Sequence, residues 1–348
     1  MRPIPARQLA LTLLLTAAGT ALAACGGTTG DEDTAGSDSD APLVYGVFAT
    51  PLEEPWDGAI HAALTSAADD GEITYKHIDN LATSDEMERA LRDIAENEQP
   101  EAIVGDAFAA EDAVRAVAKD YPDIAFAFGS GEGPQEPNLS VFDNWMQDPA
   151  YLAGMLAGGL TASDTIGVVG AMPIPEVNRI VNGFIKGVQD ENPQATVKVS
   201  FINSFFDPAA AKQAANAQVA AGADVLYAER DGVIAAAEEA DIPAIGMMVD
   251  QEEDAPEHVV TSLLWDVRPT IDAVVKQIED GPQAVDLGEY SFMKNGGSSI
   301  AEINTDIVGG VPDDLVEQVE TKKEEIESGS YTVPVDESAP KGSVTAGQ

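Results

Sequence analysis

The strongest constraint on the fold is an alternation of apolar and amphipathic segments that occurs twice along the chain. The first series predicts strands at 43–49, 73–78, 102–108, 124–129 and 139–143, with helices at 59–68, 87–96 and 111–119. After a small-residue helix at 151–160, the second series predicts strands at 166–172, 197–203, 224–229 and 244–249, with helices at 177–189, 209–221 and 233–240. This α/β pattern indicates two parallel sheets, each covered by helices on both faces.

Two such sheets joined by crossing segments form two lobes with a cleft between them. We assign residues 43–143 and about 260–348 to the first lobe, and residues 144–259 to the second. In the returning part we expect a helix at 270–278, a polar helix at 313–327 and a short strand at 331–335. Because ligands of open α/β sheets bind beyond the carboxyl ends of the strands, residues at these ends are the candidates for a site.

Residues 1–24 have the features of a lipoprotein signal peptide rather than of a folded segment. Arg2 and Arg7 precede an apolar run from Leu9 to Ala24, which is short for a membrane span. The run ends in Leu-Ala-Ala-Cys-Gly, which resembles a bacterial lipobox and predicts cleavage before Cys25 and lipid on its thiol. Cys25 is also the only cysteine. The alternative is an ordinary signal peptide with an incidental cysteine.

The segment that follows lacks the residues needed for a core. Residues 26–42 contain no aliphatic side chain larger than alanine, so we expect 25–42 to be a lipid-anchored, disordered linker. The predicted location is the extracytoplasmic face of a bacterial cell membrane, with the folded part tethered outside it.

The charge of the chain excludes one class of partner. With 61 acidic and 18 basic residues the net charge is −43, which argues against nucleic-acid binding. A solvated surface, adapted to salt, explains the acids without a specific site. A store for divalent metal ions is the alternative, but the calcium-loop pattern D-x-D-x-D-G is absent from the sequence. We therefore expect neither a metal nor a cofactor.

One stretch connects the pattern to a known family. Residues 170–193 read GAMPIPEVNRIVNGFIKGVQDENP: a strand turns sharply into a helix, with Pro175 suited to the first helical turn. This stretch closely resembles the basic membrane protein family of ABC-transporter substrate-binding lipoproteins, which includes binders of purine nucleosides and purine bases. Further matches in register occur at 54–64, 116–131, 148–159, 202–215, 222–232 and 244–251.

The resemblance implies a two-lobed fold like that of type I periplasmic binding proteins, which closes about a hinge. It implies a monomer that captures a purine nucleoside or purine base and delivers it to the membrane subunits of an ABC permease. It requires no catalysis.

Two aromatic residues lie beyond strand ends, one in each lobe. Trp56 follows the first strand, and Phe206 follows the strand at 197–203. Two rings facing each other across a cleft can hold a planar base between them, at about 1–3 kcal/mol per stacked base, and the family places aromatic residues at these two points. The neighbouring Phe205 is the alternative to Phe206.

Acidic residues occupy similar positions. Asp231 and Asp250 follow two strands of the second lobe, where a carboxylate can accept hydrogen bonds from a base or a ribose. Asp106 and Phe108 lie at the end of the third strand, on the same predicted edge. Each of these acids has the alternative of being a solvated loop residue.

The remaining candidates rest more on the family than on the pattern. Asn144 and Trp145 lie at the first crossing, where they serve either a hinge or the ligand. His61 matches a family position on the first helix, and Trp265 lies in a part of the chain that resembles the family less closely. The loop at 53–57 has no acidic pair followed by Ser-Phe-Asn, which nucleoside binders tend to carry, so the choice between base and nucleoside stays open.

Two other functions are compatible with the same sequence pattern, an enzyme and a ligand sensor. A lipid-anchored nucleoside hydrolase would need an activated nucleophile or a metal, and the three histidines, His61, His77 and His258, show no metal-ligand spacing. A ligand-sensing lipoprotein would bind in the same way but would signal to a membrane partner. Product formation from nucleosides would reveal the enzyme, and a neighbouring permease gene would favour transport over sensing.

Overall fold

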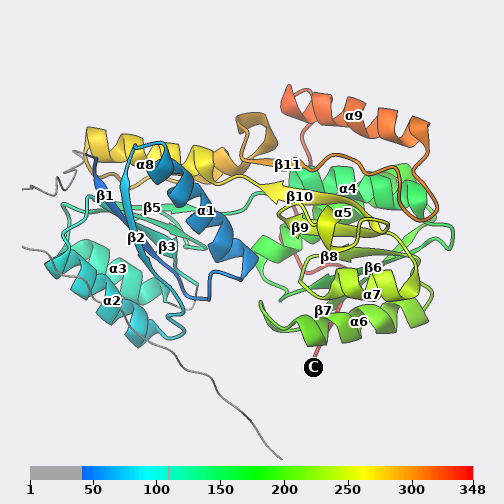
Figure 1. Cartoon of the computed structure of the whole chain (residues 1–348), viewed down its shortest axis with the longest axis horizontal. Coiled ribbons are helices and arrows are strands. Elements are labelled where there is room, and N and C mark those ends of the chain that lie inside the picture. The colour runs from blue at the N-terminus through cyan, green and yellow to red at the C-terminus, as the bar shows by residue number, and fades with distance from the viewer. Residues whose placement is uncertain (1–40, 109, 348) are drawn as a thin grey trace, which may run out of the picture. The chain divides into compact units, whose positions relative to one another are not determined.

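The computed structural model describes residues 41–108 and 110–347, and these contain two sheets (Figure 1). The predicted signal peptide and lipid-anchored linker, including Cys25, lie outside the described residues. The first sheet has the order β2-β1-β3-β4-β5, with all neighbours parallel. Its strands are β1 (Leu43–Val47), β2 (Thr74–Ile78), β3 (Ala102–Asp106), β4 (Ala125–Gly129) and β5 (Leu139–Phe142).

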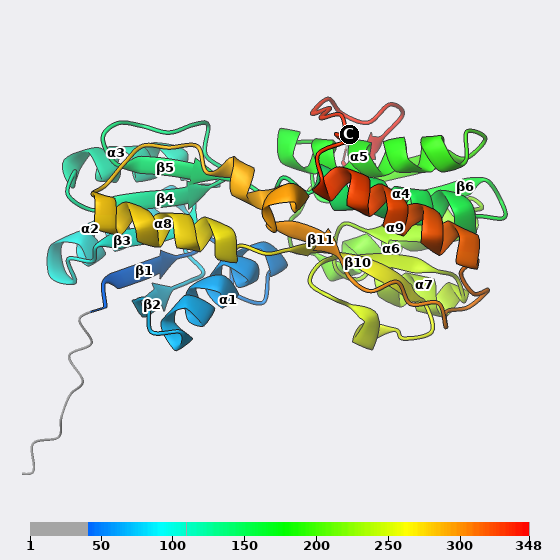
Figure 2. The same cartoon turned by 90° about the horizontal axis from the view of Figure 1, so that it is seen from above.

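Helices cover both faces of this first lobe (Figure 2). They are α1 (Pro55–Asp69), α2 (Ser84–Asn97), α3 (Glu111–Asp120) and α8 (Arg268–Asp280). Apolar residues of α1 and α8 pack with one face of the sheet, and those of α2 and α3 pack with the other. The helical spacing of Met87, Leu91 and Ile94 on α2 is the reason that this helix buries one side against the strands.

The second sheet has the order β11-β10-β9-β8-β6-β7-β12. Its strands are β6 (Thr165–Gly170), β7 (Thr196–Phe201), β8 (Val225–Ala228), β9 (Ala244–Met248), β10 (Val259–Trp265), β11 (Ser298–Ile300) and β12 (Val344–Thr345). Its helices are α4 (Gln147–Leu160), α5 (Pro175–Glu191), α6 (Pro208–Ala220), α7 (Val233–Ala240) and α9 (Asp313–Glu327). Residues of α4 and α5 pack on one face, and residues of α6 and α7 on the other.

The small residues of α4 permit an unusually close contact with α5. A Cβ atom added at Gly154 would lie 2.1 Å from the carbonyl oxygen of Phe184, and one at Gly187 would lie 1.9 Å from that of Tyr151. Both positions therefore require glycine, since a methyl group would force the helix backbones apart. This contact fixes α5, whose first turn reaches the cleft.

The predicted lobe boundary needs a correction after residue 260. β10 pairs with β9 in the second sheet rather than returning to the first lobe, and β11, α9 and β12 follow it there. In this region α8 packs on the first lobe against α1, and residues 283–291 follow it there beside β5, where the backbone N–H groups of Val141 and Leu287 donate to the carbonyl oxygens of Val285 and Val141. The run at 259–265 is buried almost throughout. Its apolar pattern therefore predicts a strand but does not specify that β9 is its partner. The strand predicted at 331–335 is also wrong, because this segment is irregular and β12 lies further on.

The chain passes between the lobes at residues 143–146, 266–267 and 288–297. Three crossings make a hinge that restricts the relative motion of the two lobes. Within the described ranges, no helix combines the length and apolar character needed to cross a membrane.

We expect the stability of this protein to increase with ionic strength. Acidic residues outnumber basic ones 61 to 18, so most carboxylates have no basic partner and repel one another. Raising chloride salt from about 0.1 M to about 1 M shortens the screening length from about 10 Å to about 3 Å. The melting temperature should rise by at least roughly 2–4 °C, equivalent to about 1 kcal/mol. Differential scanning calorimetry would measure this shift. An equal rise with a non-ionic osmolyte at the same osmolality would contradict the electrostatic cause.

Candidate functional site

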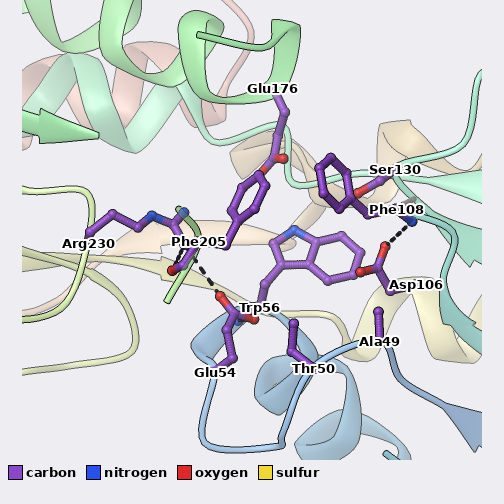
Figure 3. Close-up of a pocket in the computed structure, with 10 residues that line it drawn as sticks. All are labelled: Ala49, Thr50, Glu54, Trp56, Asp106, Phe108, Ser130, Glu176, Phe205 and Arg230. Carbon is purple, nitrogen blue, oxygen red and sulfur yellow. Dashed lines mark hydrogen bonds and ion pairs between the residues drawn. The ribbon is translucent and has the colours of Figure 1, made fainter. Parts of the chain in front are cut away.

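A cavity lies where strand ends of both lobes meet (Figure 3). The space free of atoms in it, including its open mouth, is about 420 Å³. It lies beyond the carboxyl ends of β1, β3 and β4 in the first lobe and of β6, β7 and β8 in the second, as expected for α/β sheets. Its lining residues are Ala49, Thr50, Glu54, Trp56, Asp106, Phe108, Ser130, Glu176, Phe205 and Arg230.

Trp56 forms an aromatic wall of the cavity. It stands at the start of α1, and its ring stacks on Phe142 with a centroid distance of 6.1 Å and an interplanar angle of 6°. Trp265 supports it from another side at 5.1 Å. The absence of a side chain at Gly129 makes room for the indole, because a Cβ atom there would lie 2.0 Å from its Cη2 atom. The indole nitrogen Nε1 is buried and has no hydrogen-bond partner, so it is available to a ligand.

Two phenylalanines bring the lobes into contact beside this wall. Phe108 follows β3 of the first lobe, and Phe205 follows β7 of the second. Their ring centroids are 4.9 Å apart with an interplanar angle of 75°, an edge-to-face contact. Trp56 and Phe205 thus supply aromatic surface to one cavity from opposite lobes, so a planar ligand can contact both.

Arg230 is the cation of this cavity. It follows β8, and it forms a two-point ion pair with the adjacent Glu229, at 3.0 Å from Nε and 2.6 Å from Nη2. Its Nη1 atom makes longer contacts across the cavity, 3.3 Å to the carbonyl oxygen of Phe205 and 3.4 Å to Oε1 of Glu54 in the first lobe. Glu54 in turn caps α1 by accepting from the backbone N–H groups of Trp56 and Asp57.

The acidic residues of the site are difficult to ionise. Burial raises the pKa of Asp106 well above its usual value, and the charge of Asp57 adds to the effect. Burial, together with the charge of Asp143, raises the pKa of Glu176 to about 8. Burial raises the pKa of Asp57 to about 7, although the backbone and hydroxyl of Thr50 both donate to it. The pKa of Glu54 is raised by burial too, and Arg230 opposes that shift.

A second hollow continues from the first and shares Phe108, Ser130 and Glu176 with it. It is lined on one side by Arg179 of α5, which is 2% exposed and pairs with Asp143 at 2.6 Å. Arg179 also lies over the ring of Trp145, at 4.1 Å from the ring centroid. These contacts connect the first turns of α5 to the crossing at 143–146.

Several predicted residues meet in this region. Trp56, Asp106 and Phe108 line the first cavity, and Trp145 lines the second. Asp231 lies at an adjoining small hollow beside Arg230. Asn144 is fully buried at the crossing, where Oδ1 accepts from Arg179 at 3.4 Å, so its contacts are those of the hinge.

The other predicted residues are not among those that line the cavity. Phe206 is 48% exposed, and its neighbour Phe205 lines the cavity instead, because the chain bends at these two residues between β7 and α6. Asp250 is exposed and accepts from the backbone N–H of Glu252. His61 faces the edge strand β2, where Nδ1 lies 2.8 Å from the hydroxyl oxygen of Tyr75. Trp265 lies behind Trp56, and its Nε1 donates to Ser291.

The structure also adds residues that the sequence prediction did not select. Glu54, Glu176 and Arg230 all line the cavity. The first two lie at helix N-termini, where acids are common for structural reasons, so their position alone did not indicate a site. Arg230 carried a usable signal, because it is a basic residue directly after a buried strand in a strongly acidic chain.

Comparison with known proteins agrees with this geometry. Residues 53–336 match the family model Bmp, described as ABC transporter substrate-binding protein PnrA-like. A Haloferax volcanii protein named as the ABC transporter glucose-binding protein TsgA13 is 32% identical over 270 residues, which are 75% of this chain and 68% of that protein. A purine-binding protein of Brucella abortus is 28% identical over 284 residues, 80% of this chain and 78% of that protein.

A solved ABC transporter solute-binding protein of Aeropyrum pernix has the same fold. It superposes with a TM-score of 0.71 at 20% identity, covering 85% of this chain and 94% of that one. The fold is therefore that of periplasmic binding proteins, and the family consists of binding proteins rather than enzymes. With its family match extending over both lobes, this chain belongs to the Bmp family of ABC transporter substrate-binding proteins.

Proposed function

We propose that this protein captures a purine base or purine nucleoside between its lobes and delivers it to an ABC permease, while an N-terminal lipid anchor holds it at the outer face of the cell membrane. The observation that carries the ligand class is the pair of aromatic rings, Trp56 and Phe205, that line one cavity from opposite lobes. Base–aromatic stacking contributes about 1–3 kcal/mol per base. A ligand that contacts both rings stabilises the closed arrangement by its differential affinity for it.

Isothermal titration calorimetry with adenine, adenosine, guanosine, uridine and glucose tests the ligand class. We expect the purines to bind and uridine and glucose to bind much more weakly, because a two-ring base covers more aromatic surface. The ratio of adenine to adenosine affinity reports whether the sugar is recognised. Tight glucose binding with no purine binding would overturn the proposal and would match the name given to the Haloferax relative. Unfolding and refolding first removes any co-purified ligand.

The lipid anchor has its own test, the substitution Cys25→Ser. The unmodified protein should incorporate labelled fatty acid and sediment with the membrane fraction, because Cys25 supplies the only thiol of the chain. The variant should lose both the label and the sedimentation while keeping its affinity for ligand. A variant that stays in the membrane fraction would exclude the anchor.

The transport role and the sensing role differ in the partner. Adding the ligand-bound protein to its permease in vesicles should increase ATP hydrolysis severalfold if the role is delivery. A ligand-dependent response of a membrane kinase or receptor, with no effect on any permease, would identify sensing instead.

A further inference from the structure

The ligand cavity contains more buried acidic groups than cations. Three carboxyl groups line it, those of Glu54, Asp106 and Glu176, and Asp57 lies buried beside them. Among the residues that line it, Arg230 is the only cation, and its charge is already compensated by Glu229 at 2.6 Å. A buried group of this kind cannot remain fully ionised at low cost, because each uncompensated charge loses its hydration.

Two of the carboxyl groups have oxygens without a protein partner. Glu176 is only 7% exposed, yet its buried Oε1 atom accepts no hydrogen bond from the protein. The Glu176 side chain extends from the first turn of α5 toward the ring of Phe205, inside the cavity (Figure 3). Oδ1 of Asp57 is buried and unpartnered as well. A buried acceptor that points into a cavity is a position where a ligand or a proton completes the hydrogen bonding.

The surrounding elements do not supply the missing positive charge. Glu176 is influenced by Arg179 of its own helix and by Arg230, but Asp143 and Glu229 oppose them. Arg179 is itself paired with Asp143 and with Glu337. The charges that act most strongly on these two groups are acidic: Glu54 and Asp79 on Asp57, and Asp57, Glu176 and Glu54 on Asp106. Asp231 also adds negative charge near Glu54.

The remaining wall of the cavity is aromatic, formed by Trp56, Phe108 and Phe205. Aromatic faces attract cations, and the indole of Trp does so most strongly. We infer that the cavity takes up its ligand together with positive charge, so that a neutral purine is bound with a proton and a cationic purine is bound without one. This inference rests on the proposed function and specifies which purines the site favours.

The direction of the pH dependence follows from the burial of the acids on closure. Opening of the lobes would expose Glu176 to water, where a glutamate has its ordinary pKa of 4.5, whereas burial raises the pKa of Glu176 to about 8 in this structure. Closure therefore binds a proton between these two values. The affinity for a neutral purine should be highest at acidic pH and fall by up to about tenfold per pH unit toward pH 8, where it levels off.

Calorimetry of adenosine binding in two buffers of different ionisation enthalpy counts the protons directly. We expect about one proton, or more, to be taken up per adenosine at pH 6–7. The closely related 1-methyladenosine is a cation in this range, and its binding should proceed with little or no proton uptake. The affinity ratio of 1-methyladenosine to adenosine should then rise by up to about tenfold for each pH unit, a slope that does not depend on the contacts of the methyl group.

Substitution assigns the effect to the cavity. Glu176→Gln should reduce the proton uptake and flatten the pH dependence of the ratio, and Asp106→Asn should do the same. Glu53→Gln removes the same charge from an exposed position next to the site and should change neither quantity. Adenosine binding without proton uptake, and with an affinity ratio independent of pH, would overturn the inference and leave the proposed function intact. If neither purine binds, both fail.

Discussion

Replacing Phe205 with alanine is expected to weaken purine binding by at least about fivefold, while the same change at Phe206 leaves the affinity unchanged. Phe205 lines the ligand cavity and contacts Phe108 of the other lobe, with ring centroids 4.9 Å apart. Phe206 is 48% exposed and is absent from the lining. Loss of one stacked ring costs about 1–3 kcal/mol, which corresponds to roughly 5- to 150-fold in affinity.

The two variants form a matched pair, because each removes the same side chain from adjacent positions of one loop. Calorimetry gives the affinities, and a melting curve confirms that both variants are folded. Equal loss at the two positions would mean that the loop as a whole, rather than the ring of Phe205, supports binding. A larger loss at Phe206 would restore the residue predicted from the sequence as the stacking partner.

Replacing Arg230 with methionine should destabilise the folded protein by about 3–5 kcal/mol. Arg230 is buried with Glu229, and the variant leaves that carboxylate without its two-point ion pair. Removing one partner of a buried pair has this cost because the remaining charge is uncompensated. Urea unfolding should show a lower midpoint with an unchanged m-value.

A double variant distinguishes the loss of the Arg230–Glu229 ion pair from the loss of the packing of the Arg230 side chain. Arg230→Met combined with Glu229→Gln removes both charges, and it should recover most of the lost stability, because an apolar or neutral replacement of both partners is often nearly neutral. If the double variant is as unstable as Arg230→Met alone, the loss comes from the packing of Arg230 against Phe205, over whose ring it lies at 5.3 Å.

The sequence predicted the elements well and the long-range pairing less well. The strand at 43–49 and the helix at 177–189 correspond to β1 and α5 because their apolar residues repeat at strand and helix spacing. The sheet that the strand at 259–265 joins is set by its hydrogen bonds to β9, about 15 residues earlier in the chain. The periodicity of apolar residues does not specify which strand is the partner. The same limit applies to β12, a two-residue strand without any pattern of its own.

The site shows the same division between local and tertiary information. Trp56, Asp106 and Phe108 could be selected from the sequence, since each follows a predicted strand at the edge where α/β sheets bind ligands. The choice of Phe205 over Phe206 depends on which way a short irregular segment turns. In the sequence, Glu176 is an acidic residue in the first turn of a predicted helix, where acids are common for structural reasons. It becomes part of the cavity because the tertiary structure places the first turn of α5 beside Trp56 and Asp106 of the first lobe.

By itself, then, the sequence determined the α/β class, the two series of strands and helices, the acidic character and the family, because local periodicity, composition and motif register are properties of adjacent residues. Only the tertiary structure decided which strands share a sheet, which aromatic ring lines the cavity, and that four buried acids meet beside one compensated arginine. These features depend on contacts between residues far apart in the chain. Their energies arise from burial and charge, which exist only once the lobes are assembled.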